Sequence, residues 1–171
     1  MQVETPFNDA IIKKYPEQVV IVLVKGKDGK VNPLTIGWTM LTSHEPPMMA
    51  FSVGIKRYSL ELLRQAKDYV IAFPSEEQKD AVLFFGTKSG RDIDKLAESG
   101  LSTVPAKITD CVLLSDAVAN FECTKVGEYP TGDHVIFVGT VVASHINTEQ
   151  VKRIYNVAKG YKLSGITINN T

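Results

Sequence analysis

The sequence lacks an excess of charge of either sign. Over 171 residues, 19 Lys and Arg side chains balance 19 Asp and Glu side chains. A protein that follows a nucleic-acid backbone normally carries a basic excess, so we expect no nucleic-acid partner. A small anionic ligand is still compatible with this balance, because a few local cations are enough for one phosphate.

Cysteine and histidine are also scarce. The two cysteines, Cys111 and Cys123, do not form a CxxC pair, and they indicate partly buried thiols in a reducing compartment. The three histidines are His44, His134 and His145. No two of them have the spacing of metal ligands, so no metal site is predicted.

Long apolar runs are missing as well. No segment approaches the roughly 20 apolar residues that cross a membrane. The N-terminal stretch MQVETPFNDAIIKK has neither the basic start nor the apolar core of a signal peptide. We therefore expect a cytoplasmic protein with no membrane partner. The Gly-x-Gly-x-x-Gly and P-loop motifs of nucleotide-binding folds are missing too.

The remaining composition is that of an ordinary globular domain. Hydrophobic residues make up 44% of the chain and charged residues 22%, which argues against disorder. Neither a repeat nor a low-complexity linker interrupts it, so residues 1–171 are expected to form a single domain.

Short β-branched runs alternate with turn signals along most of the chain. The expected strands are residues 18–25, 33–40, 48–54, 69–73, 112–126 and 134–146. The first two are joined by a glycine-containing turn and are expected to form a hairpin. The segment 42–47 (TSHEPP) is expected to be a loop, because paired prolines remove two backbone donors.

Helical signals are fewer. Residues 58–67 are rich in helix formers, and Ser59 is the candidate N-cap. Ser75 and Gln78 fit a capping box that opens a helix ending near Gly86. A third helical pattern, residues 91–99, ends at Gly100.

The order of these elements is not a regular β-α-β alternation. We therefore predict a mainly β protein with helical insertions, an antiparallel barrel that is closed or split. The run 134–146 is apolar on both faces, which suits a barrel whose outside is covered by helices or by a second subunit.

Residues 31–59 carry the densest functional signal. Gly37 interrupts a strand of large residues, which often marks the close approach of a ligand; a β-bulge or strand packing is the alternative. Thr42 and Ser43 precede two prolines, where hydroxyls on a rigid loop suit ribityl or phosphate oxygens; an ordinary turn is the alternative.

A predicted helix start closes this segment. Free N–H groups and the helix dipole attract anions there. Arg57 adds a planar cation that matches phosphate, and Ser59 adds a hydroxyl. Simple capping with a solvated arginine is the alternative reading.

In their order and spacing these residues resemble the flavin reductase-like domains, which include flavoredoxins and small FMN reductases. The resemblance rests on NPLT at 32–35, TSHEPP at 42–47 and RYS at 57–59. It continues with SGRDIDK at 89–95 and GDH at 132–134, and covers about residues 19–146.

The resemblance implies a split-barrel homodimer with FMN bound near the subunit interface. It assigns the flavin ring to Thr35, Ile36, Gly37, Trp38 and Thr39, and the ribityl path to Ser43, Ser52, Val53 and Gly54. It assigns the phosphate to Arg57, Tyr58 and Ser59, with Lys95 as a further candidate.

His134 matches a histidine that lies near the nicotinamide in the reductase branch. Trp38, however, stands where those reductases usually have a small polar residue, which favours the flavoredoxin-like branch. Three functions follow as hypotheses. They are an NAD(P)H:flavin reductase, using NADH or NADPH; a flavoprotein that exchanges electrons with a redox partner protein; and a split-barrel domain that binds FMN or another ligand without turnover.

Overall fold

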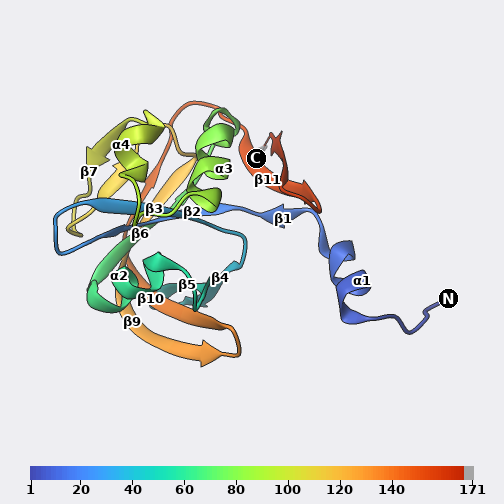
Figure 1. Cartoon of the computed structure of the whole chain (residues 1–171). Helices are drawn as coiled ribbons and strands as arrows, with labels where there is room; N and C mark the ends of the chain where they lie inside the picture. The colour runs from blue at the N-terminus through green and yellow to red at the C-terminus, as the bar shows by residue number, and fades with distance from the viewer. Residues whose placement is uncertain (168–171) are drawn as a thin grey trace.

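The computed structural model describes residues 1–167, and its centre is a seven-stranded antiparallel sheet (Figure 1). The strand order is β3-β2-β6-β9-β10-β5-β4. The strands are β2 (Val20–Lys25), β3 (Val31–Ile36), β4 (Thr39–His44), β5 (Pro47–Gly54), β6 (Asp68–Phe73), β9 (Ala119–Thr131) and β10 (His134–Ile146). The mainly β, antiparallel architecture predicted from the sequence is confirmed.

The two edge strands of this sheet are consecutive in the chain. Only Gly37 and Trp38 separate β3 from β4, although these strands lie at opposite edges of the strand order. The sheet must therefore curl until its edges approach each other. The Ser52 N–H donates to the Trp38 carbonyl at 2.9 Å and extends the β4–β5 ladder to the residue that follows the crossover at Gly37. The result is a barrel split between β3 and β4.

Both faces of β2 are buried, as its β-branched sequence predicts. Val20, Val22 and Val24 point into the barrel, where they pack in one cluster with Phe51 and Phe137. Ile21 and Leu23 point outward into a second cluster, which the helical insertions complete. The alternation of inward and outward side chains follows from the pleat of the strand.

Helices and short strands pack around the barrel. Helix α2 (Tyr58–Gln65) adds Leu60 and Leu63 to the inner cluster. The outer side is covered by η2 (Glu76–Gln78), α3 (Lys79–Thr87), α4 (Lys95–Ser99), β7 (Thr103–Pro105) and β8 (Val112–Leu114). The predicted capping box of Ser75 and Gln78 is present at the start of η2. Within the described residues, no helix is long and apolar enough to cross a membrane, and no three His, Cys, Asp or Glu side chains gather as metal ligands.

The two ends of the chain meet in a small separate sheet. β1 (Glu17–Gln18) pairs with β11 (Arg153–Ala158), which pairs with β12 (Lys162–Ile166). The N-terminal α1 (Phe7–Ile11) and η1 (Ile12–Lys14) precede β1, and α1 projects away from the barrel (Figure 1).

Several predicted boundaries were wrong. The expected strand 33–40 breaks at Gly37, because the chain crosses there from one sheet edge to the other. The expected loop 42–47 is mostly strand: Pro47 is the first residue of β5, a position where a missing N–H is tolerated, and only Glu45 and Pro46 form the turn. The expected strand 112–126 is divided into β8 and β9.

The prediction that Ser59 is the N-cap of its helix is wrong. Helix α2 starts at Tyr58 with Arg57 at the cap position, and no side chain caps it. Ser59 lies inside the first turn and is buried, and its hydroxyl accepts a hydrogen bond from Asn32 Nδ2 at 2.8 Å. The Ser59 hydroxyl therefore does not cap the helix; it connects α2 to β3 through Asn32.

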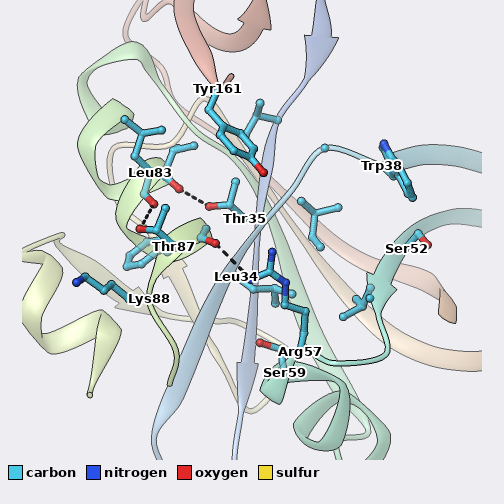
Figure 2. Close-up of a pocket in the computed structure, with 18 of the residues that line it drawn as sticks. Leu34, Thr35, Trp38, Ser52, Arg57, Ser59, Leu83, Thr87, Lys88 and Tyr161 are labelled. Carbon is cyan, nitrogen blue, oxygen red and sulfur yellow. Dashed lines mark hydrogen bonds between the residues drawn. The ribbon is translucent and has the colours of Figure 1, made fainter. Parts of the chain in front are cut away.

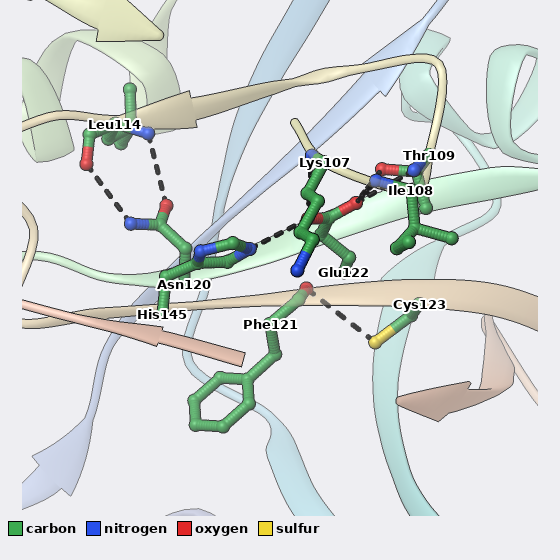
Figure 3. Close-up of polar contacts among 9 residues, drawn as sticks. All are labelled: Lys107, Ile108, Thr109, Leu114, Asn120, Phe121, Glu122, Cys123 and His145. Carbon is green, nitrogen blue, oxygen red and sulfur yellow. Dashed lines mark hydrogen bonds and ion pairs between the residues drawn. The ribbon is translucent and has the colours of Figure 1, made fainter. Parts of the chain in front are cut away.

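One carboxylate is buried on the outer side of β9 (Figure 3). Glu122 is fully buried and accepts hydrogen bonds from the amides of Lys107, Ile108 and Thr109 at 2.7–2.9 Å. His145 on β10 contacts it at 2.7 Å. Burial acts to raise the pKa of Glu122, but these hydrogen bonds outweigh burial and lower the pKa to about 2.

The two cysteines are buried free thiols. Burial is the main cause that raises the pKa of Cys111 to about 11 and that of Cys123 to about 12. Since the thiolate is the reactive form, neither side chain is suited to nucleophilic or redox chemistry.

Candidate functional site

A cavity of about 610 Å³ lies at the seam of the split barrel (Figure 2). One side is formed by the end of β3 and the crossover, another by the end of β5 and the start of α2. The remaining walls are the end of α3 with the following segment 88–91, and the small sheet formed by the two ends of the chain. Its position follows from topology, because the cavity opens where the sheet fails to close.

Twelve of the fourteen residues assigned to the site from the sequence line this cavity. They are Thr35, Ile36, Gly37, Trp38, Ser52, Val53, Gly54, Arg57, Tyr58, Ser59, Lys95 and His134. The structure does not bring Thr39 and Ser43 to it. The Thr39 hydroxyl instead donates to the Ala50 carbonyl at 2.9 Å, and Ser43 lies further along β4, paired with Met48.

Two cations define one end of the cavity. Arg57 is exposed, and its Nη1 reaches the Gly86 carbonyl at 3.5 Å. Lys95 is only 4% exposed, and its Nζ donates to the Phe85 carbonyl at 3.2 Å. Burial, with a smaller contribution from the charge of Arg57, lowers the pKa of Lys95 to about 8. An anion at this end would relieve the repulsion between the two cations.

The start of α2 adds backbone donors to the same end. Leu60 N–H already bonds the Arg57 carbonyl, but the amides of Tyr58 and Ser59 are the first of the helix and have no carbonyl partner within it. Such amides, together with the helix dipole, attract anions. This end of the cavity therefore combines two cations with two oriented N–H groups.

Gly90 holds the segment after α3 against this end. A Cβ at Gly90 would overlap the Asn32 carboxamide and lie 3.3 Å from the Tyr58 ring. Arg91 also lies over the Tyr58 ring, at 5.2 Å from its centroid. Four residues of the SGRDIDK pattern therefore line the cavity: Ser89, Gly90, Arg91 and Lys95. The backbone approaches Asn32 so closely at Gly90 that only glycine fits there.

His134 lies at the first position of β10, at the mouth of the cavity. Its Nδ1 contacts Asp133 Oδ1 at 2.6 Å, and this hydrogen bond is the main cause that lowers the pKa of Asp133. The Trp38 ring, 53% exposed, lies over the imidazole at 4.7 Å between centroids. Trp38 therefore covers the side chain that the family resemblance places near a nicotinamide.

Several lining residues were not identified from the sequence. Those of the N-terminal segment are Lys14, Tyr15 and Glu17, and those of the C-terminal hairpin are Asn156, Tyr161 and Leu163. No local pattern marks them, because they reach the cavity only through the pairing of β1 with β11. Glu17 lies 3.4 Å from where a Cβ of Gly37 would stand, so Gly37 makes room for a side chain of the chain terminus.

Comparison with known proteins agrees with this geometry. A family model described as the flavin reductase-like domain matches residues 12–162. An uncharacterized protein of Pyrococcus abyssi is 32% identical over 129 residues, which are 75% of this chain and 73% of that protein. The NADH-dependent FMN reductase AsuE2 of Streptomyces nodosus subsp. asukaensis is 32% identical over 130 residues, 76% of this chain and 69% of that protein.

Among solved structures, the flavoredoxin of Desulfovibrio vulgaris (Miyazaki F) superposes with a TM-score of 0.85 at 17% identity. The match covers 97% of this chain and 94% of that chain, and it confirms the split-barrel fold. The strand order, the cavity at the seam and the match over residues 12–162 lead to one assignment: the chain belongs to the flavin reductase-like domain family.

Proposed function

We propose that this protein binds FMN in the seam cavity and acts as an oxidoreductase that takes electrons from a nicotinamide nucleotide. The carrying observation is the cationic end of the cavity, where Arg57, the buried Lys95 and the first amides of α2 converge. A phosphate carries about −1.5 to −2 charges at neutral pH. These groups fit one such phosphate, since they offer both positive charge and fixed donors.

The rest of the cavity fits the remainder of FMN. Main-chain groups of residues 35–38 form an edge on which a flat ring can rest, and Ser52, Val53 and Gly54 line the way from that edge to the phosphate end. Thr35 contributes little through its side chain, because its hydroxyl donates to the Val82 carbonyl at 2.6 Å. When bound, FMN supplies the electron chemistry, while the chain binds and orients it.

The charge of the whole lining favours a second anionic ligand. In a chain with no net charge, the described lining holds one acid, Glu17, against six cations: Lys14, Lys56, Arg57, Lys88, Arg91 and Lys95. Lys14 already pairs with Glu17, and Arg91 pairs with Glu61. One phosphate neutralises about two of the other four. NADH or NADPH, with further phosphates, suits the remainder, and this supports the reductase hypothesis over binding without turnover.

A second candidate, exchange of electrons with a redox partner protein, is favoured by Trp38. Its ring covers His134 and is half exposed at the cavity mouth, where a large aromatic side chain leaves less room for a nicotinamide. In the reductase, His134 would contact the nicotinamide after Trp38 moves; in the electron carrier it would stay covered.

Anaerobic absorption spectroscopy separates these functions. Purified protein is loaded with FMN, and NADH or NADPH is then added alone. Loss of the yellow flavin absorption within a catalytic timescale supports the reductase. Loss only after a reduced protein donor is added supports the electron carrier. A protein that stays colourless after titration with FMN excludes both.

We also propose a homodimer. Strand β4 is an edge strand, and Trp38, Met40 and Leu41 on or next to it are 53–54% exposed. A second copy that covers β4 would bury this apolar surface beside the cavity. Thr39 and Ser43 lie on the same strand, so we place their proposed contact with the flavin at this interface. Sedimentation analysis that finds only monomers with FMN bound would exclude the dimer.

The lowered pKa of Lys95 predicts that FMN affinity depends on pH. Protonated Lys95 attracts the phosphate, and the charge is lost as pH rises through about 8. The phosphate has already lost its second proton, with pKa about 6, below this range. We expect FMN affinity to fall about fivefold between pH 7 and pH 9, equivalent to roughly 1 kcal/mol.

Fluorescence titration at several pH values checks this expectation. In Lys95→Met the fall should be much smaller, and riboflavin, which has no phosphate, should show none with either protein. An unchanged pH profile in Lys95→Met would show that another group causes the dependence.

A further inference from the structure

The C-terminal hairpin supplies a wall of the cavity that lies outside the sequence motifs of the family. Tyr161, in the turn between β11 and β12, is 70% exposed although it lines the cavity. Figure 2 shows its ring extending from the hairpin toward Thr35, over the space that Arg57 and Trp38 also face. An exposed aromatic ring that faces a cavity is available to a ligand.

The backbone of Tyr161 is held in an unfavourable conformation. Its φ is 58°, and it is the one non-glycine residue with positive φ in the described chain. A bulky side chain rarely adopts this region, and such residues cluster at ligand sites. Glycine would adopt this φ without the steric cost that a side chain adds. The tyrosine therefore does not stabilise the turn, and we look for its role in the cavity.

The hairpin is anchored firmly enough to position the ring. The Arg153 guanidinium, on β11, lies 4.2 Å from the centroid of the Phe73 ring on β6. At the other strand, the Gly165 N–H donates to Glu76 Oε1 at 3.0 Å. Both contacts attach the hairpin to the barrel and to η2, so Tyr161 is carried on a fixed element.

Asn156, on the same hairpin, provides an unused acceptor. It lines the cavity and is 8% exposed, and its Oδ1 has no hydrogen-bond partner within residues 1–167. A buried acceptor without a donor is unfavourable. The oxygen is closed off from solvent in this structure, and a turn of the carboxamide toward the cavity would let it accept from an N–H group of a ligand.

We infer that Tyr161 and Asn156 form a ring-binding wall. Tyr161 packs on the face of a planar heteroaromatic ring of the bound ligand, and Asn156 accepts a hydrogen bond from an N–H at the edge of that ring. The inference rests on the proposed function, because flavin and nicotinamide both carry such a ring with an amide N–H. Both residues position the ligand and take no part in electron transfer.

The test uses Tyr161→Gly, which removes the ring and also relieves the positive φ. We expect the melting temperature to rise by about 2–4 °C, while affinity for the ring ligand falls about tenfold. Binding of FMN is followed by flavin fluorescence, and binding of NAD⁺ to the FMN-loaded protein by calorimetry. Lys162→Ala, an exposed neighbour outside the cavity lining, is the matched control and should change neither affinity.

Each outcome is decisive. Weaker FMN binding assigns the wall to the flavin, and weaker NAD⁺ binding with unchanged FMN binding assigns it to the nicotinamide. Asn156→Leu should weaken the same ligand. Unchanged affinity for both ligands, in a stabilised Tyr161→Gly protein, overturns the inference while leaving the proposed function intact. A wild-type protein that binds no FMN overturns both.

Discussion

In Arg57→Ala, the affinity for FMN falls about 30-fold while the affinity for riboflavin stays nearly unchanged. A hydrogen bond to a charged group contributes roughly 1.5–3 kcal/mol, and 2 kcal/mol corresponds to about 30-fold. Only FMN carries the phosphate, so only FMN loses this interaction. Arg57 is exposed and makes one long contact, with the Gly86 carbonyl, so its removal leaves the fold intact.

Titration of flavin fluorescence with each ligand measures both affinities. Arg64→Ala is the matched control, because Arg64 lies on α2, the helix that starts directly after Arg57, but pairs with Glu128 and does not line the cavity. It should bind FMN as the wild type does. If Arg57→Ala lost the same affinity for FMN and for riboflavin, the phosphate could not be assigned to this end of the cavity.

In Glu122→Gln, the free energy of unfolding falls by about 3 kcal/mol, a large loss for an isosteric change. Glu122 is fully buried and accepts from three successive amides, from the Thr109 hydroxyl and from His145. An amide offers one acceptor oxygen and adds donors that face donors. The segment 107–109 would therefore lose its attachment to β9.

Thermal unfolding measures the loss, which corresponds to about 10 °C in a chain of this length. Glu61→Gln is the control, because Glu61 forms an exposed ion pair with Arg91, and such pairs contribute little. A shift below about 2 °C in Glu122→Gln would show that the buried carboxylate is not a structural support.

The pH dependence of stability gives an independent check on Glu122. Its pKa in the folded protein is lowered from 4.5 to about 2, so its contribution is complete above the unfolded pKa. It is lost as pH falls from about 4.5 toward 2. The wild-type protein should therefore lose stability more steeply over this window than Glu122→Gln.

The sequence predicted the parts of the fold that depend on local patterns. The strand β2, the capping box at Ser75 and the long strand β10 all appear as expected. The predicted boundaries were wrong where contacts between distant parts of the chain determine where a strand ends. The break at Gly37 exists because β3 and β4 join opposite sheet edges, and periodicity within one strand contains no information about that crossing.

The same distinction applies to the site. Residues 35–38, 52–54 and 57–59 form contiguous motifs, and all of them line the cavity. Thr39 and Ser43 belong to the same motif, yet they lie outside the lining, because β4 continues along β5 beyond the crossover. Asn156 and Tyr161 were missed, since pairing between the two ends of the chain brings them to the barrel seam.

The most direct test of the central claim is a titration of the purified protein with FMN, followed by flavin absorbance and fluorescence. The expected result is saturable binding of one FMN per chain, with a lower affinity in Arg57→Ala and a higher midpoint of thermal unfolding when FMN is bound. No change in the flavin signal at any ratio of FMN to protein, with the protein folded, would contradict it.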